Sequence, residues 1–184
     1  PKTHLLSRDD PTTRNYSEPL YLFPATSLYA TGFAATACGV ARAFLNAFIS
    51  TVSDKIPRAQ THMLRDNNVI QADVARCHVR LATARTFLRE EVKNIWHSVS
   101  SSGKLSVEQR MRIRLSSTHA IHEAKAVVDT LYDHAGATAI FANSPFERRF
   151  RDIHTIAQQV QGRQTHFQTV GAFLLGNEAD LRLV

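Results

Sequence analysis

The sequence predicts an all-α fold, an antiparallel four-helix bundle with long helices. After residue 24, apolar residues recur every three or four positions, which places them on one face of an α-helix. Residues that break helices are scarce, because the 184 residues include only 7 Gly and 6 Pro. No segment after residue 24 shows the apolar–polar alternation of a half-buried strand.

Composition indicates one globular domain with a mildly basic surface. The chain is 43% hydrophobic and 21% charged, and its formal net charge is +6. The arginines are spread along helical faces and form no single run. We therefore expect a solvated basic surface and no nucleic-acid partner.

Other features indicate a cytoplasmic protein. Cys38 and Cys77 form no Cys-x-x-Cys pair, and we expect both to be reduced, buried thiols. The longest apolar stretch, residues 28–52, is interrupted by Arg42 and Asn46, so we expect it to be too polar to span a bilayer. The chain starts at Pro1 without an initiator Met, and we expect an upstream segment.

The expected organisation is an extended lead-in over residues 1–24, followed by the helical bundle over residues 25–184. Prolines preceded by acidic residues, such as Pro19 after Glu18, oppose helix in the lead-in. The first helix is expected from Thr26 and is ended by Pro57. Its predicted buried face consists of Ala34, Ala41, Leu45, Phe48 and Val52.

The second helix is predicted to start near Asp66 or Asn67, either of which could cap it. This helix is expected to end in the Ser-Ser-Ser-Gly run at residues 100–103. In between, one apolar stripe continues for about seven turns, longer than an average helix. Its members are Ile70, Val74, Cys77, Leu81, Ala84, Leu88, Val92 and Ile95.

A third helix is predicted to open at Ser106, because Gln109 follows at capping-box spacing. Gly136 is its expected C-cap. The buried stripe between them is predicted to contain Met111, Leu115, Thr118, Ile121, Val128 and Leu131.

The fourth helix is predicted from a second capping box. Ser144 is the expected N-cap, Pro145 fits the first helical position, and Glu147 completes the box. This helix is expected to run to about Gln161, and a last helical piece to follow over residues 164–175.

The sequence lacks the common catalytic and metal-binding motifs. There is no Gly-rich phosphate loop, no His-Glu-x-x-His and no Gly-x-Ser-x-Gly. No Glu is followed by a His three residues later, as a di-iron bundle would need. His119 and His122 are one turn apart, but no carboxylate pattern supports a metal site there. We therefore expect no metal.

The fourth helix carries a dense polar string around His154. Two interpretations are open: a solvated helix face with an Arg–Asp pair, or the polar wall of a ligand pocket. The candidate pocket residues are Arg151, Asp152, His154, Thr155, Gln158 and Gln159.

Several segments together resemble the acyl-CoA dehydrogenase superfamily. Residues 144–155, with Arg151-Asp152, resemble its Arg-Asp helix, and residues 170–176 resemble its usual ending. The remaining similar segments, in chain order, are residues 39–42, 71–85 and 132–136. The match covers nearly the whole chain, and the chain is most similar to the flavin-dependent monooxygenase branch. The resemblance implies the C-terminal helical domain of a larger flavoenzyme, with a β-domain upstream.

Two departures from the dehydrogenase pattern favour the monooxygenase branch. Counted from Arg151, the position of the dehydrogenase's catalytic glutamate is Val160, which cannot accept a proton. The dehydrogenases also carry an arginine motif where this chain reads Gln60-Thr61-His62, so a charge-assisted phosphate contact is lost.

The resemblance also implies a cofactor, partners and site residues. The cofactor is a flavin, FAD or FMN, bound mainly by regions outside this chain, with Arg58 and Gln71 contributing from a neighbouring subunit. His154 is the implied proton-transfer residue, because Gln158 and Gln159 cannot act as acid or base near neutral pH. The implied partners are the other subunits of a homo-tetramer, a dimer of dimers formed through the bundle, and a separate flavin reductase. The isolated domain is expected to be inactive.

Two alternatives stay open at the level of the sequence. One is a true acyl-CoA dehydrogenase. The other is a non-catalytic helical assembly or adaptor module, whose basic surface would bind an acidic partner or RNA. An upstream reading frame that encodes further domains would exclude the adaptor.

Overall fold

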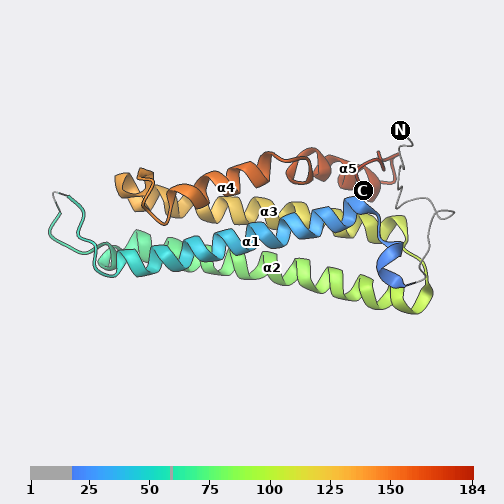
Figure 1. The fold of residues 1–184 in the computed structure, drawn as a ribbon, viewed down its shortest axis with the longest axis horizontal. Coiled ribbons are helices and arrows are strands. Elements are labelled where there is room, and N and C mark those ends of the chain that lie inside the picture. Colours follow the sequence, from blue (N-terminus) through green and yellow to red (C-terminus); the bar gives the residue numbers. More distant parts are fainter. Residues whose placement is uncertain (1–17, 59) are drawn as a thin grey trace, which may run out of the picture.

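The computed structural model describes residues 18–58 and 60–184, and its long helices lie side by side in a bundle (Figure 1). The α-helices, in chain order, are α1 (Ala25–Val52), α2 (Asn68–Ser102), α3 (Val107–Ala135), α4 (Glu147–Gln158) and α5 (Thr165–Leu174). No strand occurs in these two ranges. The prediction of three long helices and a broken fourth is confirmed.

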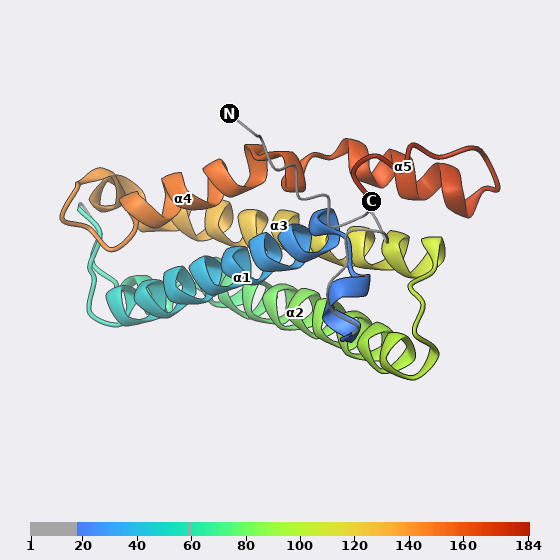
Figure 2. The same ribbon diagram turned by 45° about the vertical axis from the view of Figure 1, so that its right-hand side comes forward.

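The pair α1 and α3 forms the centre of the bundle. These two helices share the most extensive packing, and α2 and α4 pack on opposite sides of them (Figure 2). α4 and α5 follow one another along α3 and together fill the fourth position. Connections lie at alternate ends of the bundle, so neighbouring long helices run antiparallel (Figure 1).

The core consists of the predicted stripes. All five residues predicted for the face of α1 are buried, and in α2 and α3 every predicted stripe residue is buried or half-buried. Phe44 of α1 packs against Phe146, at the start of α4, with ring centroids 5.0 Å apart. Cys38 and Cys77 are free and buried, as predicted, and burial raises the pKa of both thiols.

Local side chains fix the ends of α2 and α3. Asn67 Oδ1 accepts hydrogen bonds from the backbone N–H groups of Val69 (2.9 Å) and Ile70 (3.3 Å). Ser106 and Gln109 form the predicted capping box at the start of α3. Gly103 and Gly136 follow the two helices with φ of 67° and 62°, conformations that favour glycine.

The predicted capping box of the fourth helix is wrong. α4 begins at Glu147, and Ser144 Oγ accepts a hydrogen bond from the backbone N–H of Phe146 at 3.3 Å. Residues 144–146 therefore form a turn before the helix. α4 also ends at Gln158, earlier than predicted, because Gln159 is extended (ψ 155°) and a 3-10 turn, η5 (Val160–Gly162), follows.

Gly162 makes this break possible, because it packs against the last turn of α4. A Cβ on Gly162 would lie 2.8 Å from the carbonyl oxygens of Ile156 and Ala157, closer than real contacts allow. We expect Gly162→Ala to lower the free energy of unfolding by about 1–3 kcal/mol in a urea titration. The control is Gly171→Ala in α5, where nothing lies within 4 Å and alanine should stabilise the helix. Equal effects of the two substitutions would contradict this account.

The lead-in is only partly described. Residues 1–17 lie outside the described residues, and the expected upstream β-domain stays a prediction. Pro19–Leu22 form a short 3-10 helix, η2, so this part of the predicted extended segment is wrong. Pro19 stands at the first helical position, where its fixed φ favours a helical turn.

The argument from polarity against a membrane span was also wrong. α1 is long and apolar enough to cross a membrane by length and composition, with a mean hydropathy of 1.4 over its most apolar window. The core helix of a globular bundle passes the same test, and α1 packs along both α2 and α3.

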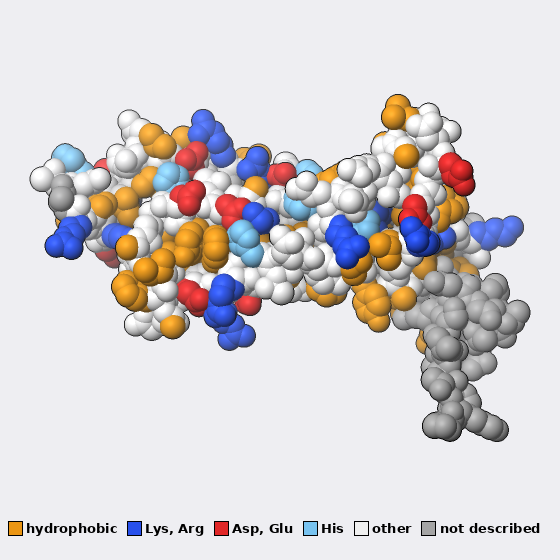
Figure 3. All heavy atoms as spheres, turned by 90° about the horizontal axis from the view of Figure 1, so that it is seen from above, with side chains coloured by type: hydrophobic (Ala, Val, Ile, Leu, Met, Phe, Trp, Pro, Cys, Tyr) orange, Lys and Arg blue, Asp and Glu red, His pale blue; other side chains and the backbone are white. Residues whose placement is uncertain are grey.

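On the face that carries α4 and α5, basic, acidic and histidine side chains are interspersed (Figure 3).

Candidate functional site

His154 lies on α4 and faces α3. Its Nε2 is 2.8 Å from Oδ1 of Asp129, and its side chain is 34% exposed. The ring packs against Phe150 at 4.3 Å between centroids, and Phe150 stacks on Tyr132 of α3 at 4.0 Å. Two aromatic rings and a carboxylate thus hold the imidazole in one orientation.

Asp129 connects His154 to a lysine. Its second oxygen, Oδ2, accepts a hydrogen bond from Lys125 Nζ at 2.5 Å, one helical turn earlier on α3. When Nε2–H of His154 donates to Asp129, Nδ1 keeps a lone pair that can accept a proton. The arrangement Lys125–Asp129–His154 is therefore suited to oriented proton transfer.

A polar hollow of about 480 Å³ adjoins this group, between α3 and the junction of α4 with α5. Asp129 and Lys125 line it from α3, and Gln158 lines it from α4. His122 closes one side, since its Nε2 donates to the carbonyl oxygen of Gly162 at 2.8 Å. The other lining residues are Ala126, Ala157, Arg163, Gln164 and Thr165.

The other predicted pocket residues of α4 lie apart from this hollow. Arg151 is exposed and pairs with Glu147 at 2.6 Å, while Asp152 lies 3.7 Å from Arg148. Thr155 is exposed, and its hydroxyl donates to the carbonyl oxygen of Arg151 at 2.9 Å. These three side chains point to solvent. A further partner for them would have to come from outside the described residues.

Gln159 and Val160 lie at the break between α4 and α5. Gln159 Oε1 accepts a hydrogen bond from the backbone N–H of Gln161 at 2.6 Å and so caps η5. The carbonyl oxygen of Val160 accepts from Nε2 of His166 at 2.7 Å. His166 is buried, and this burial lowers its pKa.

Arg58 and Gln71 lie in a different region, at the end of the bundle where α1 is joined to α2 (Figure 1). Both are exposed, and Gln71 Nε2 donates to the carbonyl oxygen of Arg65 at 2.8 Å. Their predicted contact with the cofactor of a neighbouring subunit stays a prediction. Within residues 18–58 and 60–184, no group of three or more His, Cys, Asp or Glu is arranged to hold a metal ion.

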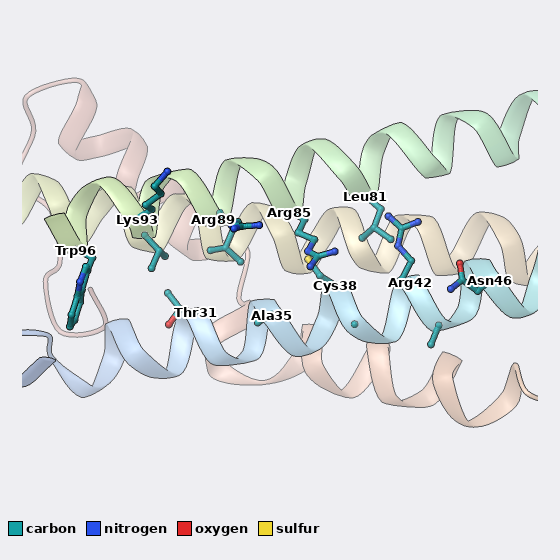
Figure 4. Close-up of a pocket in the computed structure, with 14 residues that line it drawn as sticks. Thr31, Ala35, Cys38, Arg42, Asn46, Leu81, Arg85, Arg89, Lys93 and Trp96 are labelled. Atoms are coloured by element: carbon teal, nitrogen blue, oxygen red, sulfur yellow. The ribbon is translucent and has the colours of Figure 1, made fainter.

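Two features were missed in the sequence. One is the buried guanidinium of Arg114, which shares the helical register of the predicted α3 stripe between Met111 and Thr118. The other is a groove of about 810 Å³ between α1 and α2 (Figure 4). Its signal was the four-residue spacing of Arg85, Arg89 and Lys93.

Comparison with known proteins identifies the family. Residues 31–163 match the family model described as "Acyl-CoA dehydrogenase, C-terminal domain". The chain belongs to this family. The resemblance seen in the sequence is thereby confirmed.

Relatives and solved structures of similar fold include several oxygenases. Indole-3-acetate monooxygenase of Pseudomonas putida is 29% identical over 164 residues, which cover 89% of this chain and 42% of that protein. The 3-HSA hydroxylase of Rhodococcus sp. RHA1 has a TM-score of 0.80 at 20% identity, covering 92% of this chain and 43% of that one. XiaF from Streptomyces sp., solved in complex with FADH2 and glycerol, has a TM-score of 0.82 at 16% identity. The match covers 96% of this chain and 44% of XiaF. The chain thus spans less than half the length of these relatives.

Proposed function

We propose that this chain is the C-terminal helical domain of a flavin-dependent monooxygenase that hydroxylates an aromatic or heteroaromatic substrate. The proposal rests on the match, over 89% of the chain, to a relative named as a monooxygenase. A second relative, from Rhodococcus erythropolis, is named as a pigment production hydroxylase and is 25% identical over 148 residues.

Val160 favours a monooxygenase over an acyl-CoA dehydrogenase. Its side chain has no proton acceptor, and its carbonyl oxygen is already bonded to His166. The next glutamate along the chain is Glu178, which is exposed and lies beyond the end of α5. Residues 153–177 therefore supply no carboxylate that replaces the dehydrogenase base along the α4–α5 break.

The described residues fit an edge of a flavin site rather than a complete one. Arg58 is an exposed guanidinium with no ion pair among the described residues, so it can meet a phosphate of FAD or FMN. The side-chain oxygen of Gln71 accepts no hydrogen bond from the described residues, so it can accept one from the cofactor. A bound reduced flavin would carry out the chemistry with molecular oxygen. His154 would accept or donate a proton at Nδ1.

The test is a hydroxylation assay on the longer protein. It should be supplied with reduced flavin by a separate flavin reductase and offered indole and phenol carboxylates. We expect oxygen consumption and a hydroxylated product. Enoyl-CoA formation from an acyl-CoA without oxygen would replace the monooxygenase assignment by a dehydrogenase.

The isolated chain, residues 1–184, is expected not to bind flavin tightly and to be inactive. The reason is that only Arg58 and Gln71 among the predicted cofactor contacts lie in it, at one end of the bundle. Equilibrium dialysis against FAD and FMN should leave the protein colourless. A yellow preparation with one flavin per chain would contradict this prediction.

The proposed assembly is a cytoplasmic homo-tetramer that receives reduced flavin from the reductase. Exposed apolar side chains at several sites, such as Tyr29 (61% exposed), Phe141 (58%) and Leu175 (80%), support further packing between subunits or domains. Light scattering on the longer protein measures the molar mass of the assembly, and a monomeric mass would exclude the tetramer.

A further inference from the structure

The α1–α2 groove, with a volume of about 810 Å³, is larger than the hollow beside Asp129 (Figure 4). It extends from Thr31 to Asn46 on α1 and from Leu81 to Trp96 on α2. At a rise of 1.5 Å per residue, each side is about 22 Å long. A trough of this length matches about four turns of a third helix and is long for a compact ligand.

The floor of the groove is apolar and built from small residues on α1. Ala35, Gly39 and Ala43 follow at four-residue spacing and line the groove. A Cβ added at Gly39 would meet nothing within 4 Å, so the space above it is open. Leu81 and Leu88 supply the floor on the α2 side. A helix backbone can therefore approach α1 closely and bury an apolar stripe.

The rim of the groove is basic. Arg85, Arg89 and Lys93 form a row with four-residue spacing on α2, and Arg42 extends into the groove from α1 (Figure 4). No carboxylate lines the groove, and none of these four cations takes part in an ion pair within the described ranges.

The other arginines of α2, Arg76 and Arg80, are paired with carboxylates, Arg76 with Asp73 at 2.8 Å. Arg80 pairs with Glu123 at 2.6 Å, and Arg112 pairs with Glu91 at 2.7 Å. Within the described ranges, the unpaired Arg and Lys side chains of α2 are thus gathered at the groove, where acidic side chains of an occupant would pair with them.

We propose that the groove seats an amphipathic helix that carries Asp or Glu at four-residue spacing beside an apolar stripe. Carboxylates repeated every four residues lie on one helix face and match the 6 Å steps of the basic row. The net charge of +6 opposes a second copy of this chain as the occupant.

The source of the helix is the part of the same protein outside residues 1–184. The relatives are more than twice as long as the matched region, which covers 42% of the Pseudomonas putida protein. The inference rests on the proposed function in one respect, that this chain is part of a longer protein. It does not depend on the flavin or on the reaction.

Carbodiimide cross-linking of the longer protein tests the proposal, because the reagent joins an amine to a carboxylate that touches it. After digestion and mass spectrometry, we expect Lys93 to be linked to an Asp or Glu in an apolar, helix-forming segment outside residues 1–184. Lys93→Arg should abolish this link, since a guanidinium does not form the amide. The double variant Arg85→Glu/Arg89→Glu should reduce its yield at least tenfold, and the control Arg148→Glu on α4 should not.

Two results would overturn the proposal. One is a link from Lys93 to this same region of a second copy. The other is no link, with Lys93 acetylated in the longer protein as fast as the exposed Lys104 between α2 and α3. A failed hydroxylation assay with the Lys93 link intact would count against the proposed reaction only.

Discussion

Arg114→Ala is expected to lower the free energy of unfolding by about 4 kcal/mol. Arg114 is 1% exposed, and no carboxylate pairs with it among the described residues. Its guanidinium donates to Gln161 Oε1 at 2.7 Å, to the carbonyl oxygen of Leu183, and to that of Thr26 at 3.4 Å. Truncation leaves the amide oxygen of the buried Gln161 without this donor and also creates a cavity.

The charge of Arg114 is retained in the folded protein. Burial lowers its pKa to about 10, which still leaves the guanidinium protonated at neutral pH. The contacts tie α3 to η5, to the start of α1 and to the C-terminal segment. Arg114 therefore also fixes the α4–α5 break, where Gln158 and Val160 lie.

Urea unfolding followed by circular dichroism measures the effect. Arg148→Ala, at an exposed arginine of α4, should change stability by less than about 0.5 kcal/mol. Arg114→Met keeps much of the volume and removes the buried charge, so we expect an intermediate loss. An Arg114→Ala protein as stable as the Arg148→Ala control would show that the buried contacts contribute nothing.

His154→Gln is expected to reduce the turnover number of the longer protein about 100-fold, the lower end of what a positioned acid or base contributes. Glutamine can still donate a hydrogen bond to Asp129, so the α3–α4 contact is retained. It cannot accept a proton near neutral pH. The pH profile of kcat/KM should lose one ionisation.

The control for this substitution is His78→Gln, at an exposed histidine of α2, which should leave the turnover number unchanged. Unfolding of each variant should be measured in parallel. A His154→Gln enzyme with full turnover and only lower stability would make His154 a purely structural residue.

Local chemistry made the helices of this protein predictable. Asn67, Ser106 and Gly136 cap their helices through groups within a few residues, and the apolar stripes follow from the helix period. The Ser144 box failed because the same spacing also suits a turn, and Phe146, packed against Phe44, decides where α4 begins.

The candidate site was predictable only in part. His154 was singled out from the polar string of α4, but its partner Asp129 lies 25 residues earlier on α3. Of the five other predicted pocket residues, only Gln158 lines the hollow. Pairing across helices depends on their rotation and register, which the helix period does not give.

The sequence by itself determined the helical bundle, the buried stripes and, through its resemblance, the family. Only the tertiary structure decided which polar residues act together. It buried Arg114, joined Asp129 to His154, and left the cations of the α1–α2 groove unpaired. The physical reason is that caps and stripes are short-range, whereas burial and pairing are set by elements that meet from distant parts of the chain.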